Sequence, residues 1–223
     1  MNIEDLLPYI LTRAKGCPEP TANEAVITAA REFLERTRAW NYERVLPLAE
    51  LNLDTSTVNG TTFDTIDSDT GEISPSLPAD SVLHDISFAR MDGQTITPIA
   101  LQTLDEERPD WRDEYGAPEN VTQISIDKIR LVPRQDTGDL FISVKLKPAY
   151  GATTLPDFMG TQYRKAIRAG ALAEIFSIPG EVFTNPGLAD AHKAEFMSEI
   201  GRYLNAGTKG QIRARRGVKA RFY

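Results

Sequence analysis

Cysteine and histidine are scarce in this chain. Its 223 residues include one cysteine, Cys17, and two histidines, His84 and His192. A single thiol excludes a disulfide framework and any metal cluster held by several thiolates. We expect Cys17 to be an incidental thiol. We expect both histidines to be structural, because His84 lies in a strand-like run and His192 in a helical apolar stripe.

Long apolar runs, internal repeats and low-complexity tracts are also missing. No run approaches the ~20 apolar residues that cross a bilayer, so we expect no membrane association. Apolar residues make up 41% of the chain and charged residues 26%, which is typical of a globular protein. A chain of this length buries a core without disulfides or metal ions.

The common catalytic and nucleotide-binding motifs are absent. We find no phosphate-binding loop, no dinucleotide-binding glycine pattern, no His-Glu-x-x-His and no Gly-x-Ser-x-Gly. Asp67 to Gly71 resembles the start of a calcium loop, but its glycine stands at the fifth position and Pro78 at the twelfth, where a glutamate is needed. We therefore expect a polar turn there, and we predict no catalytic residue, no cofactor, no metal and no enzymatic activity.

Carboxylates gather between residues 105 and 114, at Asp105, Glu106, Glu107, Asp110, Asp113 and Glu114. They could supply an acid and a base, as in a cell-wall hydrolase, or bind magnesium. Such catalysis needs one carboxyl group with a raised pKa. Because Arg108 and Arg112 alternate with these acids, we favour solvated, ion-paired groups in an excursion between strands.

Charge is distributed unevenly. The chain has 25 basic and 32 acidic residues and a net charge of −7. Six of the basic residues and none of the acidic ones lie in residues 206–223, so the remainder carries a net charge of −13. A cationic end of this kind is suited to phosphate or to an acidic protein surface.

Three interpretations of this tail remain open. It could clamp a DNA duplex nonspecifically, with strong salt dependence. It could order on an acidic protein partner and bury its apolar residues as anchors, or it could be an idle solvated tail. We favour docking because the tail ends in Phe222 and Tyr223. The predicted docking residues are Lys209, Ile212, Arg213, Arg215, Arg216, Val218, Lys219, Arg221, Phe222 and Tyr223.

Hydrophobic periodicity predicts an α+β fold. We expect N-terminal helices in residues 1–43, with a second helix from Thr21 to about Ala39 that Thr21 and Glu24 begin as a capping box. Alternation with period two then predicts an antiparallel β domain in residues 44–150. Its segment 54–78, rich in Thr, Ser and Asp, is expected to be an exposed hairpin or loop, with Asn59-Gly60 as a tip.

Helical periodicity returns in residues 151–205. We expect a helix from about Leu155 to Ser177 with Asp157 as a possible cap, and a second helix that begins at Asn185-Pro186. This C-terminal hairpin would complete a bundle with the N-terminal helices, and residues 206–223 would form an extended basic arm. The residues predicted to pack between helices are Tyr163, Ile167, Gly170, Ala171, Phe196 and Ile200.

Several short motifs spread along the chain resemble those of the head-to-tail adaptor proteins of tailed bacteriophages, especially short-tailed ones. They are Leu155-Pro156-Asp157, Tyr163 with Ala166-Ile167 and Gly170-Ala171, Pro179-Gly180, Asn185-Pro186 with Leu188-Ala189, Gly116-Ala117-Pro118, Leu131-Val132-Pro133 and Lys147-Pro148. The resemblance covers nearly the whole chain. It departs at Gln135, where a proline would be expected, and in segment 54–78, which has no assigned counterpart.

The resemblance implies a structural protein of the virion neck, assembled in the host cytoplasm. It implies a homo-oligomeric ring, usually of twelve copies, that lies beneath the portal protein and contacts tail nozzle or fibre proteins. The ring would continue the channel for double-stranded DNA without binding it specifically, and the C-terminal arm would climb onto the portal. A nonspecific DNA-binding module that uses the basic tail is the alternative function.

Overall fold

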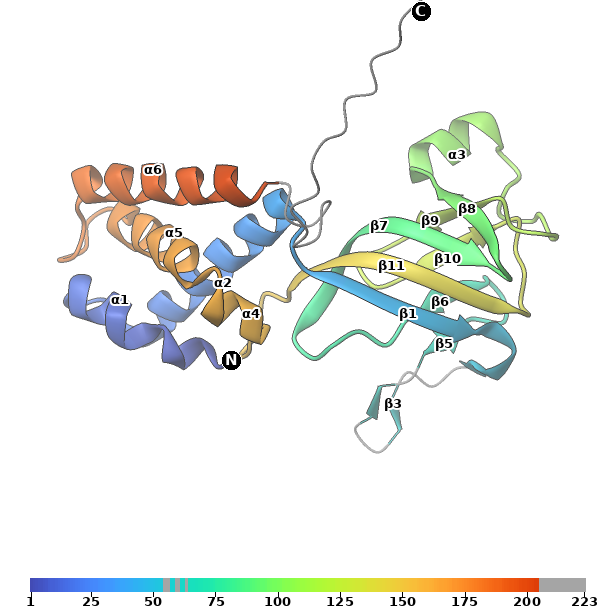
Figure 1. Cartoon of the computed structure of the whole chain (residues 1–223), viewed down its shortest axis with the longest axis horizontal. Helices are drawn as coiled ribbons and strands as arrows, with labels where there is room; N and C mark the ends of the chain where they lie inside the picture. Colours follow the sequence, from blue (N-terminus) through green and yellow to red (C-terminus); the bar gives the residue numbers. More distant parts are fainter. Residues whose placement is uncertain (54–56, 59–60, 63, 205–223) are drawn as a thin grey trace, which may run out of the picture.

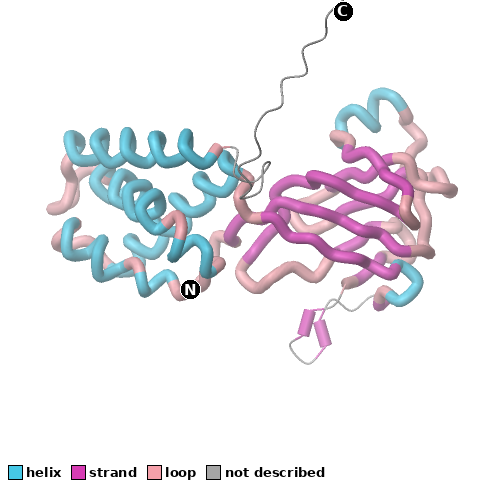
Figure 2. The backbone as a smooth tube through the Cα atoms, viewed as in Figure 1, coloured by secondary structure: helices cyan, strands magenta, loops and turns pink. Residues whose placement is uncertain are grey.

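The structure is a computed structural model that describes residues 1–53, 57–58, 61–62 and 64–204. It is an elongated molecule with helices at one end and a curled sheet at the other (Figure 1), so the predicted α+β class is confirmed. We call residues 1–40 and 149–204 the helical half and residues 41–148 the sheet half. The chain passes between the halves at two neighbouring places, after α2 and after β11 (Figure 2).

The helical half is built from both ends of the described chain. Its elements are a 3₁₀ turn η1 (Ile3–Asp5), α1 (Leu7–Arg13), α2 (Glu19–Thr37), α4 (Asp157–Thr161), α5 (Arg164–Ser177) and α6 (Pro186–Tyr203). Helices from opposite ends of the sequence pack together: α2 contacts α5 and α6, and α1 contacts α2 and α5.

The predicted capping box at the start of α2 is wrong. The helix begins two residues before Thr21, with Pro18 as its N-cap residue and no side chain bonded to its first amides. Pro20 occupies the first turn, where its fixed φ suits a helix and its missing N–H has no partner to lose. This favours the earlier start.

The helix predicted from Leu155 is broken in two. Tyr163 leaves helical geometry (φ −114°, ψ 9°) and separates α4 from α5, which places its ring 4.9 Å from the ring of Phe33 and 5.9 Å from that of Phe158. Asp157 is the first residue of α4 and does not cap it; its carboxylate lies 2.7 Å from the N-terminal ammonium of Met1. The prediction for α6 is confirmed, because Asn185 accepts a hydrogen bond from the Leu188 amide.

The sheet half contains one nine-stranded sheet in the order β1-β11-β7-β8-β9-β10-β6-β5-β2. Its strands are β1 (Asn41–Pro47), β2 (Asn52–Leu53), β5 (Thr65–Ile66), β6 (Glu72–Ser74), β7 (Ser81–Met91), β8 (Gln94–Pro98), β9 (Asn120–Gln123), β10 (Ile129–Val132) and β11 (Asp139–Pro148). A 3₁₀ turn η2 (Leu48–Glu50) follows β1, and α3 (Leu101–Glu107) follows β8.

The sheet is mixed, whereas the sequence predicted antiparallel pairing throughout. Six of the eight pairings are antiparallel, but β8 pairs with β9 in parallel and so does β2 with β5. Between β8 and β9 the chain runs through α3 and residues 108–119, which is long enough to return it to the starting end of β8. A parallel pair requires such a crossover.

Part of segment 54–78 belongs to the large sheet. Its part from Thr65 to Ser74 joins the large sheet as β5 and β6, and Ile66 and Ile73 are buried. This part is an antiparallel hairpin, one of the two forms expected, but the expectation that it is exposed is wrong because its two isoleucines are buried in the core. A small antiparallel pair, β3 (Thr57–Val58) and β4 (Thr61–Thr62), flanks the predicted Asn59-Gly60 tip, which itself lies outside the described residues.

Each half has its own hydrophobic core, and Trp40 packs against both. Polar contacts join the halves beside it. The Arg31 guanidinium donates to the Pro148 carbonyl and lies 3.7 Å from the ring centroid of Tyr150. Lys147 pairs with Glu35 at 2.6 Å. The boundary between the halves thus combines one shared aromatic side chain with buried hydrogen bonds and ion pairs.

Candidate functional site

The six residues predicted to pack between helices lie in the core of the helical half: Tyr163, Ile167, Gly170, Ala171, Phe196 and Ile200. Gly170 marks the closest approach of three helices. A Cβ atom placed on it would lie 2.7 Å from the Cβ of Ala29 on α2 and 3.0 Å from the Phe196 ring on α6. Only glycine permits this spacing, so the compact bundle depends on that position.

The last turn of α6 is fixed in the same bundle. The Tyr203 ring lies 4.9 Å from the Tyr163 ring and 6.2 Å from the Phe33 ring. α6 therefore ends against α2 and α5, near the middle of the molecule (Figure 1). The ten predicted docking residues, from Lys209 to Tyr223, follow that end and lie outside the described residues.

Two acidic side chains of the cluster between 105 and 114, Asp105 and Glu114, lie 2.7 Å and 3.9 Å from an arginine nitrogen. Asp105 accepts hydrogen bonds from Arg112 at 2.7 Å and from the indole of Trp111 at 2.9 Å. These two bonds lower the pKa of Asp105. Arg108 bonds Glu119 at 2.7 Å. The geometry agrees with solvated ion pairs, since a general acid would need a raised pKa.

The sequence pattern did not predict the helix and the buried aromatic side chain that organise this segment. α3 occupies its first part, and Trp111 is 1% exposed, packed in a small cluster with Leu104 and Val132. A tryptophan among charged residues was the available signal, because a large aromatic side chain in a polar segment usually has an apolar site to fill.

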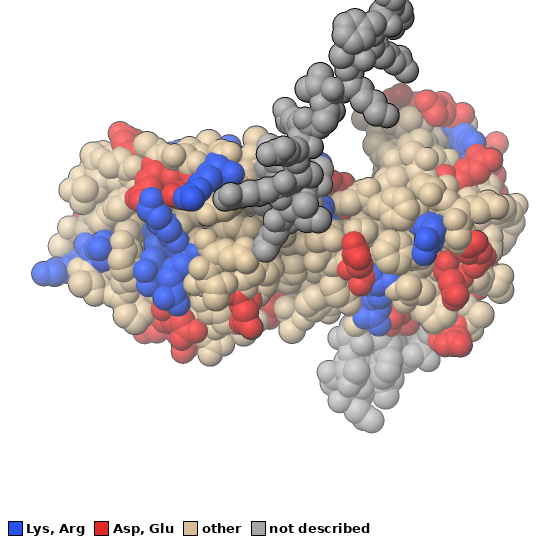
Figure 3. Space-filling view, viewed as in Figure 1, with Lys and Arg blue, Asp and Glu red and all other residues tan. Residues whose placement is uncertain are grey.

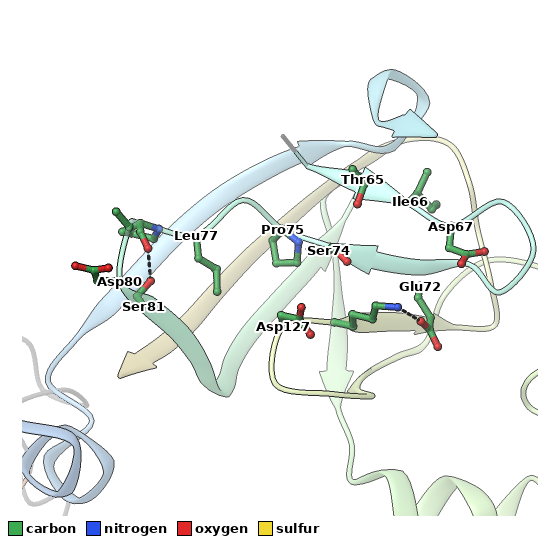
Figure 4. A pocket seen from close by; sticks show the side chains of 13 residues that line it. Thr65, Ile66, Asp67, Glu72, Ser74, Pro75, Leu77, Asp80, Ser81 and Asp127 are labelled. Atoms are coloured by element: carbon green, nitrogen blue, oxygen red, sulfur yellow. Dashed lines mark hydrogen bonds and ion pairs between the residues drawn. The ribbon is translucent and has the colours of Figure 1, made fainter. Parts of the chain in front are cut away.

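A large hollow lies on the sheet half, between the β5–β6 segment, the turn before β7 and the turn before β10 (Figure 4). It is open and has a volume of 640 Å³. Four carboxylates line it, but each already has protein partners. Asp67 accepts the amides of Thr70 and Asp69, and Glu72 lies 2.8 Å from Lys128.

The other two carboxylates of this hollow are also engaged. Asp127 accepts from the Ser125 hydroxyl at 2.8 Å. One oxygen of Asp80 accepts the amides and hydroxyls of Thr153 and Thr154, at 2.7 to 3.1 Å. These acids stabilise turns and the junction with α4, and the predicted polar turn at Asp67 to Gly71 is present.

The cysteine and the two histidines also lie in surroundings that suit a structural role. Burial, followed by the charge of Lys147, lowers the pKa of His84. The His192 ring stacks on Phe176 with centroids 5.8 Å apart. Burial, with the charge of Glu181, raises the pKa of the Cys17 thiol. Within the described residues, no three His, Cys, Asp or Glu side chains gather as metal ligands.

None of the helices in the described part of the chain combines the length and apolar character needed to cross a bilayer. Comparison with protein families gave one result that spans both halves. The family model described as SU10 adaptor protein matches residues 1–220. A search of curated proteins found no match.

Proposed function

Because the chain belongs to the SU10 adaptor protein family, a family of phage structural adaptors, we propose that it is the protomer of a head-to-tail adaptor ring. The ring joins the portal to the tail nozzle or fibre proteins and continues the channel through which DNA is retained and ejected. It is a structural part of the virion neck and catalyses no reaction. The observation that carries the proposal is the family match, which spans both halves and most of the basic segment.

Assembly into a ring of twelve copies requires heterologous contacts that close by rotation. The structure supports this use of the chain, because each half has its own core and the two halves present different surfaces. Different surfaces of such a subunit can meet different neighbours.

The basic segment is proposed to dock on the portal. It begins directly after α6, whose last turn is packed against Tyr163 and Phe33. A firmly held starting point lowers the entropy cost of ordering an arm on its partner. The six cations and the apolar residues of the segment suit an acidic protein surface with hydrophobic pockets.

DNA is proposed to pass without being held. The chain outside residues 206–223 carries a net charge of −13, and like charges repel a duplex. A channel lined by such subunits lets the genome slide, while the cations of residues 206–223 bind a protein partner.

The test is portal decoration by the full chain and by a chain that ends at residue 205. Both are mixed with the portal ring of the same phage and imaged by electron microscopy. We expect the full chain to decorate the portal as a ring and the shortened chain to lose decoration. Lys193→Ala, which removes an exposed cation on α6, is the matched control and should dock normally.

Equal decoration of the portal by both chains would overturn the proposal that residues 206–223 dock on it. The DNA-binding alternative is tested on the same two proteins with a free duplex at ~50 mM salt, where a six-cation clamp would bind with steep salt dependence. Binding that requires residues 206–223, together with portal decoration that does not, would replace the proposal with the alternative.

A further inference from the structure

A second hollow, of 330 Å³, lies on the helical half between α1, the α4–α5 turn and α6. Its lining includes Tyr9, Arg164, Lys165, Arg168, Leu172 and Glu195. We call it the basic groove. Figure 3 shows Lys and Arg side chains crossing the helical half in a band, with acidic side chains beside it.

Three guanidiniums of this region lack an acidic partner. Arg13 and Arg168 both lie against the Tyr9 ring, with their Cζ atoms 3.6 Å and 4.1 Å from its centroid. Arg164 makes no ion pair. Among the described residues no carboxylate pairs with any of these three arginines, so their positive charges stand together without compensation.

The fourth cation is different. Lys165 lies 3.2 Å from Glu195 and 3.0 Å from Glu199, and Arg202 and His192 also face these two carboxylates. The α6 side of the groove is therefore neutralised. The uncompensated charge is confined to the side formed by α1 and α5.

The hydrogen-bonding groups of Arg168 are only partly satisfied by the described residues. Its Nε atom is buried and has no hydrogen-bond partner. A buried donor without an acceptor is costly. Burial, followed by the charges of Arg164 and Arg13, also lowers the pKa of Arg168. An oxyanion bound in the groove would offset the repulsion between the arginines.

The walls favour a protein carboxylate over a DNA phosphate. Tyr9 contributes a half-buried aromatic ring to the lining beside the arginines, which suits an apolar side chain next to an acidic one. A duplex carries a charge every ~1.7 Å along its axis, so its neighbouring phosphates would meet Glu195 and Glu199. A single carboxylate bound beside the arginines would not come close to these two acidic side chains.

We propose that the basic groove docks an acidic peptide segment of a partner protein. Its carboxylate lies between Arg164 and Arg168, and its neighbouring apolar side chain packs beside Tyr9. This surface uses none of the residues of the predicted docking arm, so it goes beyond the function proposed above and can be tested separately from it.

The experiment is a titration of the ¹⁵N-labelled full chain followed by NMR. The probe is the peptide acetyl-Leu-Glu-Glu-Leu-amide, and its control is acetyl-Leu-Gln-Gln-Leu-amide. We expect the acidic peptide to shift the Arg168 Nε–H signal and nearby amides saturably, and the glutamine peptide to bind about tenfold more weakly.

Two variants locate the effect. The double variant R164Q/R168Q should weaken binding of the acidic peptide about tenfold or more, whereas Lys193→Gln on the exposed side of α6 should leave it unchanged. If the double variant does not fold, Arg164→Gln alone is used, because its side chain is exposed; it should weaken binding about threefold.

Three results would overturn the proposal. Equal binding of the two peptides would show that charge is not recognised. Stronger displacement of these signals by a short DNA duplex would assign the groove to nucleic acid. Shifts that depend on protein concentration without peptide would assign it to a second copy of this chain.

Discussion

Lys147 Nζ lies 2.6 Å from Glu35 Oε1, and this ion pair joins strand β11 to helix α2 across the boundary between the halves. The two residues are 112 positions apart in the sequence. The Lys147 side chain is 16% exposed, so salt screens this pair less than a pair on the open surface. The contact couples the stability of the two halves.

Glu35→Gln should lower the free energy of unfolding by about 1 kcal/mol at neutral pH, since Glu35 is partly exposed and its pair is worth less than a fully buried one. Urea denaturation measures the change. Arg36→Gln, which breaks only an exposed pair with Glu32 on the same helix, should cost less than about 0.5 kcal/mol.

The contribution of Glu35 should also depend on pH. Burial alone would raise its pKa, but the hydrogen bond and charge of Lys147 outweigh burial and lower it. A lowered folded-state pKa stabilises the protein above the unfolded pKa, and this stabilisation is lost as pH falls through the folded value. The difference between wild type and Glu35→Gln should therefore shrink below about pH 4, and a constant difference would contradict the assignment.

Gly170→Ala should destabilise the protein by about 1–3 kcal/mol, because the new methyl group would overlap Ala29 and press on Phe196. This cost exceeds the ~1 kcal/mol that alanine gains over glycine in a helix. Gly201→Ala on α6 has no atom within 4 Å of the new methyl and should be neutral or stabilising. Thermal denaturation of the two variants shows whether close packing or helix propensity determines the effect of alanine at each position.

Asp80→Ala should cost about 2 kcal/mol, because it removes the acceptor of the Thr153 and Thr154 amides. Asp80 also has a positive φ of 59°, which asparagine tolerates better than alanine. Asp80→Asn should therefore be milder in urea denaturation. The Thr154 hydroxyl is the first cause of the lowered pKa of Asp80, so the stabilisation should fade in acid.

Arg134→Met should destabilise the sheet half by about 2 kcal/mol. The side chain is buried and donates to the carbonyls of Ser68 and Asp69 at 2.9 Å and 3.0 Å, and methionine keeps the stem but removes the donors. Hydrogen exchange should speed up first in the amides of residues 67–74. Uniform acceleration in both halves would contradict a local role.

Periodicity predicted the parts of the fold in which local pattern and tertiary packing agree. The Asn185-Pro186 start of α6 is a local signal and is present in the structure. The capping box at Thr21 failed because a competing start signal, Pro20, lies one residue earlier. The break at Tyr163 depends on aromatic partners far away in sequence, such as Phe33, and no local pattern contains that information.

The sequence predicted some of the functional surfaces and not others. The small residue at Gly170 pointed to a close helix contact, and the structure places it there. The basic groove was invisible, because Tyr9, Arg13 and Arg168 come together only when α1 packs beside α5. The mixed sheet was missed for the same reason, since the parallel pairing of β8 and β9 is set by the route of the chain through α3.

The insertion of the sheet between α2 and α5 dictates an order of events during synthesis. α2 leaves the ribosome long before its partners, with Val26, Ala29 and Phe33 uncovered. Closing a loop of more than a hundred disordered residues is entropically expensive, whereas a folded sheet brings Lys147 back to Glu35. We therefore expect the folded sheet half to act as an internal template for the bundle, and a nascent chain stalled before α5 to expose the apolar face of α2.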